Sequence, residues 1–131
     1  MKAVYGQMRS FVSGRPCSHP QTLAGRIDTE IPELNNVYGL IDCSGRMKEF
    51  AATLRRFRDA EVWLKVSNFD GAESIRMEIA DASFQAYGDH HSQFLFNGAI
   101  AGDEEMVCEF TRELHSLLRL AGFNVWFEIY D

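Results

Sequence analysis

The sequence predicts an α+β fold, with a mostly antiparallel sheet and two helices packed on one face of it. Three observations support this prediction. Residues 103–131 have the spacing of an amphipathic helix followed by an amphipathic strand. Residues 36–67 have the pattern strand, helix, strand, and residues 74–100 alternate as a strand meander does. Two such units around a meander are typical of a ferredoxin-like (split βαβ) arrangement, here with an extra N-terminal strand.

A length of 131 residues fits one domain, 1–131, and is enough to bury a core. The apolar share of 46% and the charged share of 24% are ordinary for a soluble globular protein. No apolar run approaches the roughly 20 residues that cross a bilayer, and the first residues lack the apolar stretch of a signal peptide. These features predict a cytoplasmic protein that does not bind a membrane.

The first part of the chain, residues 1–35, is predicted to hold one strand and a long irregular loop. Residues 2–12 have the pattern of a strand, although Gly6 weakens it. Residues 13–35 contain all three prolines and two glycines, which indicates irregular structure. A loop of this length is usually either functional or laid over the body of its domain.

The unit 36–67 starts with a strand that ends at Cys43, and Ser44 and Gly45 can cap the helix that follows. The apolar stripe of this helix continues as far as Phe57. A second strand then alternates apolar residues with aromatic or charged ones.

Residues 74–100 are predicted to form the meander, and its first strand alternates cleanly. The sequence leaves open whether 83–87 continues that strand or starts another. A further strand covers 93–100. Its Asn97–Gly98 pair has the composition of a hairpin turn, but the flanking segments are short, so we expect a bulge within or at the end of one strand.

A faint internal repeat relates the two strand–helix–strand units, because a shift of 63 positions places Trp126 on Trp63 and Val125 on Val62. If the helices cover the face that holds the valines, the opposite face carries aromatic and charged residues, which is typical of a recognition surface. These residues are Trp63, Lys65, Arg76, Glu78, Trp126, Glu128 and Tyr130. The N-terminal segment, a second copy of the chain, or a different partner could cover this face.

The net charge of −6 is unevenly distributed along the chain. Residues 1–65 hold ten basic and seven acidic residues, a balance of +3, whereas residues 66–131 hold three and twelve, a balance of −9. Asp103, Glu104 and Glu105 also place negative charge on the first turn of the last helix. An acidic half excludes a phosphate-backbone site there and suits a basic partner, although a merely solubilising surface explains it as well.

The three cysteines, Cys17, Cys43 and Cys108, are an odd number in scattered contexts, so we expect no disulfide framework and predict that Cys108 is a thiol in a reducing compartment. Cys43 lies where a strand meets a helix, and a helix N-terminus can lower a thiol pKa. A nucleophile pair could use Cys17 or Cys43 with His19 or His91 as base, and the place of Cys43 is the best catalytic argument in the sequence. A small thiol at a strand end is nevertheless ordinary, so we expect no enzyme.

Cys17, His19, His90 and His91 carry groups that bind zinc, but their spacing matches no paired ligand motif. The glycines are too dispersed for a phosphate loop or a dinucleotide fingerprint, and no calcium loop is present. We therefore expect no metal and no cofactor.

Size, charge and the lack of a catalytic motif together predict a small acidic binding protein that occludes a basic protein partner. An immunity protein, antitoxin or inhibitor that neutralises a bacterial toxin or nuclease has these properties. The residues expected to bind the partner are Trp63, Trp126, Glu128, Tyr130, Asp103, Glu104 and Glu105. The alternative is a dimeric ferredoxin-like domain that binds a ligand or catalyses a reaction with Cys43 and His91.

Overall fold

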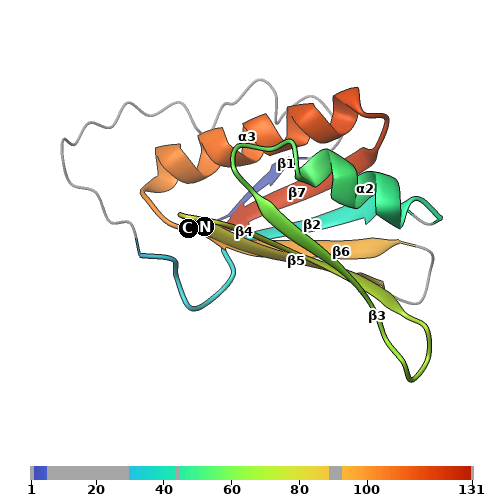
Figure 1. Ribbon diagram of the computed structural model, residues 1–131. Helices are drawn as coiled ribbons and strands as arrows, with labels where there is room; N and C mark the ends of the chain where they lie inside the picture. Colours follow the sequence, from blue (N-terminus) through green and yellow to red (C-terminus); the bar gives the residue numbers. More distant parts are fainter. Residues whose placement is uncertain (1, 6–29, 44, 89–92, 131) are drawn as a thin grey trace.

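The computed structural model describes residues 2–5, 30–43, 45–88 and 93–130, which form one sheet and two helices (Figure 1). The strands are β1 (Lys2–Tyr5), β2 (Val37–Asp42), β3 (Glu61–Val66), β4 (Glu73–Ile79), β5 (Ala82–Gly88), β6 (Phe94–Ile100) and β7 (Asn124–Tyr130). The helices are α2 (Met47–Leu54) and α3 (Glu104–Leu120).

The sheet has the strand order β1-β7-β2-β6-β5-β4-β3, and every neighbouring pair is antiparallel. The strands β3 to β6 follow one another as a meander. α2 connects β2 to the edge strand β3, while α3 connects β6 to β7 with β2 between them. The predicted α+β class with a mostly antiparallel sheet is confirmed.

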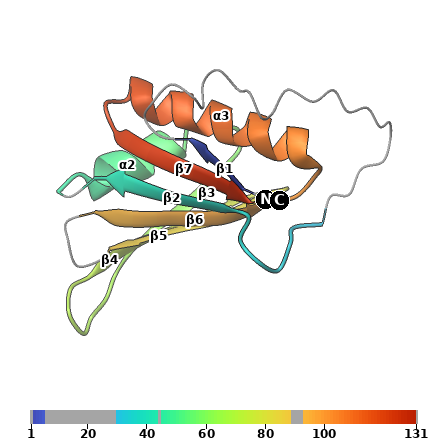
Figure 2. The same cartoon turned by 180° about the vertical axis from the view of Figure 1, so that it is seen from behind.

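Both helices lie over the same face of the sheet (Figures 1 and 2). α3 packs mainly on β7, and α2 packs on β3 and β4. We call the face beneath the helices the helix face and the opposite one the open face. Among the described residues, neither helix covers the open face.

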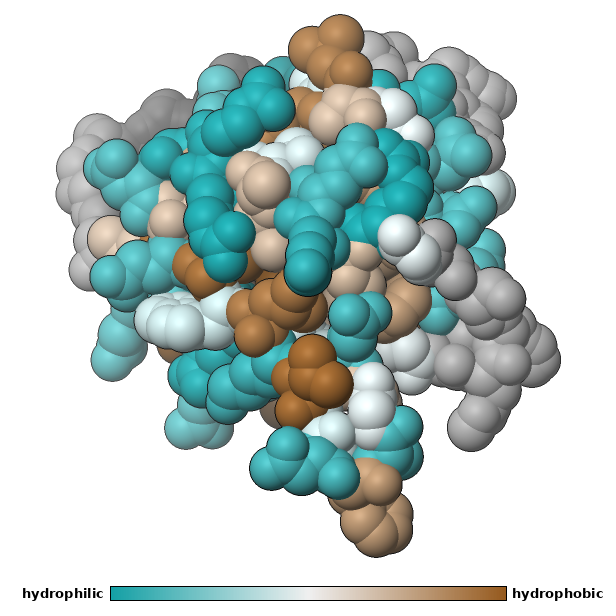
Figure 3. Space-filling view, turned by 45° about the vertical axis from the view of Figure 1, so that its right-hand side comes forward, coloured by the Kyte–Doolittle hydropathy of each residue, from teal (hydrophilic) through white to brown (hydrophobic). Residues whose placement is uncertain are grey.

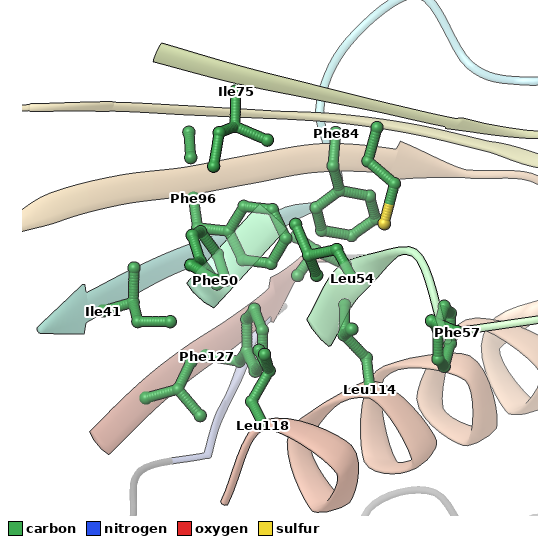
Figure 4. Packing of buried hydrophobic residues seen from close by; sticks show 14 of the residues in the cluster. Ile41, Phe50, Leu54, Phe57, Ile75, Phe84, Phe96, Leu114, Leu118 and Phe127 are labelled. Carbon is green, nitrogen blue, oxygen red and sulfur yellow. The ribbon is translucent and has the colours of Figure 1, made fainter. Parts of the chain in front are cut away.

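The core lies between the helix face and the helices, and aromatic rings dominate it (Figure 4). Phe50 of α2 contacts Phe96 of β6 edge-on, with ring centroids 5.2 Å apart. Phe110 of α3 meets Phe57 in the same way at 5.1 Å and stacks on Phe84 at 6.0 Å. Each buried phenylalanine side chain stabilises the fold by about 1.5–3 kcal/mol, so these five rings make a large contribution to the packing of the two helices on the sheet.

α2 is shorter than its apolar stripe predicts. The helix ends at Leu54, and the next turn tightens, with Phe57 N donating to Leu54 O. Phe57 is buried all the same, because the tight turn brings it back onto α3. The helix N-cap is Arg46, which makes no side-chain capping bond. Ser44, predicted as part of the cap, lies outside the described residues.

The meander contains four separate strands, and residues 83–87 belong to a strand of their own, β5. The prediction of a bulge at Asn97–Gly98 was wrong. Both residues lie inside β6, and its pairing with β5 runs through them without a break. The pairing of β6 with β2 is interrupted opposite Tyr38 and Gly39 but keeps the same register on both sides. Gly98 is needed because a Cβ atom there would lie 2.4 Å from the ring of Phe84. The glycine therefore permits close aromatic packing and does not make a turn.

Asn36 joins three strands at one end of the sheet. Its side chain donates to Ile100 O and accepts from Ile100 N, both at 2.9 Å, and thus pairs with β6 as a backbone residue would. Its carbonyl accepts from Tyr130 N of β7 at 2.8 Å. These bonds fix the start of β2, and with it the side chains that β2 presents on the open face.

Candidate functional site

Three cross-strand pairs of the adjacent strands β2 and β7 lie on the open face. The register places Tyr38 beside Glu128, Leu40 beside Trp126 and Asp42 beside Asn124. Their neighbours along each strand point into the core, since successive strand residues alternate between faces. The open face therefore has an apolar step, Leu40 with Trp126, between two positions that each carry a carboxylate.

The large apolar side chains of this area are half-exposed although they lie on interior strands of the sheet. The exposed fractions are 39% for Tyr38, 37% for Leu40 and 42% for Trp126. Side chains of this size on a rigid sheet lose little entropy when a partner covers them, which is why aromatics are enriched in binding hot spots.

Two hollows lie on either side of the apolar step and share Leu40 and Trp126 as a common wall. The larger, which we call the Glu128 hollow, has a volume of about 410 Å³, and the smaller, the Asp42 hollow, about 250 Å³. The Glu128 hollow is lined by Tyr38, Gly39, Leu40, Leu95, Asn97, Trp126 and Glu128. The Asp42 hollow is lined by Leu40, Asp42, Gln93, Asn124, Val125 and Trp126.

Hydrogen bonds hold the Glu128 hollow in shape. The Tyr130 hydroxyl donates to Glu128 Oε1 at 3.0 Å, and the Tyr130 ring meets Tyr38 edge-on with centroids 5.1 Å apart. Asn97 on the floor accepts from Gly39 N and donates to the Tyr87 hydroxyl, both at 3.1 Å. A carboxylate, two aromatic rings and an aliphatic floor are thus arranged before any ligand arrives.

Trp63 and Trp126 both lie on the open face, but they are far apart on it. Trp63 lies on the edge strand β3, five inter-strand steps from β7, which corresponds to about 24 Å. A polar hollow lined in part by Lys65 and Arg76 lies near Trp63, and Arg76 Nε binds Glu78 at 2.8 Å. The structure therefore brings Trp126, Glu128 and Tyr130 together and leaves Trp63 apart from them.

The acidic residues at the start of α3 belong to the helix layer. Asp103 is the N-cap, and its carboxylate accepts from Met106 N at 2.9 Å, so it has a structural role. Glu104 lines a surface hollow together with Tyr130, at the end of β7. Glu105 lies in the first turn of the helix. Glu104 thus shares a hollow with Tyr130, one of the residues predicted to bind the partner.

Tyr38 and Leu40 were not among the residues predicted to bind a partner. Both alternate with the buried residues Val37 and Ile41, and this alternation in the sequence indicates that they lie on the open face. Their importance depends on β2 lying next to β7, and the period of a strand does not reveal its neighbours.

Cys43 does not have the depressed pKa expected at a helix start. The residue is fully buried, and its Sγ contacts Met47 Sδ at 3.4 Å. Burial, reinforced by the negative charge of Asp42, raises the pKa of the Cys43 thiol from 9.0 to about 12. At neutral pH the side chain is a protonated core group without access to a substrate.

Cys108 also differs from the expectation of a thiol. It is buried and disulfide-bonded, and its partner lies outside the described residues. Cys17, His19, His90 and His91, considered above as metal ligands or bases, lie outside the described residues too. Within the described ranges no three acidic, histidine or cysteine residues are grouped so as to hold a metal ion.

No helix in the described part of the chain is both long and apolar enough to cross a membrane. Comparison with protein-family models, curated proteins and solved structures found no match. The geometry of the open face is therefore the basis on which a function is argued.

Proposed function

We propose that the protein is an acidic binding module whose open face occludes a basic region of another protein, in the manner of an immunity protein or inhibitor. The observation that carries this proposal is the half-exposed row of Tyr38, Leu40 and Trp126 on a rigid sheet, with Glu128 and Asp42 beside it. Buried apolar anchors supply most of the binding energy of such interfaces, while surrounding charges set specificity and association rate.

The net charge of −6 supports a basic partner. A one-signed field raises the rate at which an oppositely charged protein arrives, and the effect weakens as salt screens it. A catalytic role for Cys43 is not part of the proposal, because a buried thiol with a raised pKa supplies no nucleophile.

For the fold, we infer a ferredoxin-like, split βαβ arrangement enlarged by three strands. The support is the path of the chain: each helix joins strands that have other strands between them, and both helices lie on one face. The strands β4 and β5 would be additions placed between β6 and β3, and β1 would be the extra N-terminal strand beside β7. A cytoplasmic location stays a prediction, and the disulfide at Cys108 weakens it, since disulfides persist mainly in oxidising compartments.

The proposal is tested by affinity capture with three forms of the protein: wild type, Trp126→Ser and Trp63→Ser. The two tryptophans are equally exposed, 42% and 43%, and lie on the same face, so Trp63→Ser is a matched control. We expect a basic protein that wild type and Trp63→Ser retain and Trp126→Ser loses.

Binding of the purified partner is then measured by calorimetry at rising salt. We expect Trp126→Ser to weaken binding by at least about 2 kcal/mol, as hot-spot residues do, and affinity to fall with ionic strength. Equal binding by both variants, or an affinity that does not change with salt, contradicts the proposal.

A further inference from the structure

The proposed function does not say which side chains of the partner are bound. The two hollows beside Trp126 indicate which kind of side chain fits. Each hollow combines an aromatic wall with one carboxylate: Glu128 in the larger hollow and Asp42 in the smaller. Aliphatic Leu40 belongs to both, and Leu95 adds to the larger hollow. An aromatic wall, a carboxylate and an aliphatic floor match the three parts of an arginine side chain.

Arginine fits this combination better than any other side chain. Its planar guanidinium stacks on aromatic rings and pairs with a carboxylate through two parallel hydrogen bonds, while its methylene stem covers apolar surface. In the Glu128 hollow, Trp126 and Tyr38 supply the rings and Leu95 the apolar surface. Lysine lacks the planar fork and gains less from both interactions.

The distance between the two carboxylates determines how far apart the two arginines of a bound segment must lie. Asp42 and Glu128 lie four residues apart along the paired strands and one strand apart across them, a separation of about 14 Å. In an extended segment, side chains at positions i and i+4 lie on one side and about 13.6 Å apart, with position i+2 midway between them. The midway position would lie over the apolar step of Leu40 and Trp126.

We propose, on the basis of the proposed function, that the open face binds an extended partner segment of the pattern Arg-x-apolar-x-Arg. One arginine enters the Glu128 hollow, the second enters the Asp42 hollow, and the apolar residue packs on Leu40 and Trp126. The charge of the segment complements the two carboxylates, so the partner is a protein segment and not a nucleic acid, which would meet the same carboxylates with phosphates.

The test uses three peptides with blocked ends: Arg-Ser-Leu-Ser-Arg, the same peptide with citrulline for both arginines, and Arg-Leu-Ser-Ser-Arg. Citrulline keeps the shape of arginine and removes its charge. In the third peptide the leucine lies on the side of the extended chain opposite to the two arginines. Binding is followed by ¹H–¹⁵N NMR through the two indole N–H signals. Trp126 reports on the site, and Trp63, on the far edge strand, is the internal control.

We expect the first peptide to shift the Trp126 signal saturably, with a Kd on the order of 1 mM, and to leave Trp63 unchanged. Citrulline should weaken binding about tenfold, and the moved leucine about fivefold. Glu128→Gln and Asp42→Asn should each weaken it about threefold, since each removes one exposed ion pair and keeps a hydrogen-bond acceptor. Dispersed NMR spectra verify that the variants fold.

Equal binding of the citrulline peptide, a shift at Trp63 with none at Trp126, or no shift of either signal would overturn the assignment. These results are distinct from failure of the proposed function, in which Trp126→Ser leaves the binding of a full-length partner intact. A Trp126 shift that depends on protein concentration alone assigns the face to a second copy and overturns both.

Discussion

At the scale of single residues, Cys43 shows how burial decides chemistry. Its pKa of about 12 lowers the thiolate fraction at pH 8 about a thousandfold relative to the ordinary value of 9.0. We predict that iodoacetamide leaves Cys43 unmodified in the native protein at pH 8 and modifies it fully in urea, as measured by peptide mapping. The free energy of unfolding should also fall between pH 9 and 12 in wild type relative to Cys43→Ala, because the unfolded thiol loses its proton first. Rapid native alkylation would restore Cys43 as a candidate nucleophile.

Gly98 is a second residue whose role depends on its packing. A methyl group there would collide with the ring of Phe84, which stacks on Phe110 in the core. We predict that Gly98→Ala lowers the free energy of unfolding by about 1–3 kcal/mol in urea denaturation, the usual cost of overpacking. Gly88→Ala is the matched control, because a methyl group there approaches only the Phe94 ring, at 3.3 Å, and should change stability by less than about 0.5 kcal/mol. Equal effects would show that Phe84 moves aside freely.

At the scale of elements, the three acidic residues Asp103, Glu104 and Glu105 at the start of α3 differ in role, because one of them is structural. Asp103 caps the helix, whereas Glu105 lies in the first turn beyond it. We predict that Asp103→Ala lowers stability by about 1 kcal/mol and that Asp103→Ser restores most of it, because serine also caps helices. Glu105→Gln should cost less than about 0.5 kcal/mol by the same thermal or urea unfolding. A stable Asp103→Ala variant would argue against the capping role.

Sequence periodicity predicted most elements because each signal is local. The stripe of α3 and the alternation of β7 follow from helical and strand geometry, and the observed bounds, Glu104–Leu120 and Asn124–Tyr130, agree with the pattern. The end of α2 at Leu54 was missed because buried Phe57 continues the stripe without continuing the helix. Strand order is not local, so the sequence placed Trp63 beside Trp126 on one face without showing the strands between them.

At the scale of the whole molecule, charge argues against self-association through the open face. Two copies joined through the β2–β7 pairs of this face would bring Glu128 and Asp42 close to the same carboxylates of the second copy, and each chain carries a net charge of −6. Like charges across an interface cost free energy, most of all at low salt where screening is weak. The same charges that suit a basic partner therefore oppose a dimer.

We accordingly predict a monomer of 14.9 kDa in sedimentation equilibrium at about 0.05 M salt and about 100 µM protein. Neutralising both carboxylates, in Asp42→Asn with Glu128→Gln, removes the repulsion and leaves Tyr38, Leu40 and Trp126 exposed. That double variant should associate measurably more than wild type, and adding Trp126→Ser should reverse the gain. A wild-type dimer at low salt that Trp126→Ser dissociates would mean that Tyr38, Leu40 and Trp126 already contact a second copy, and that the acidic residues tolerate one another.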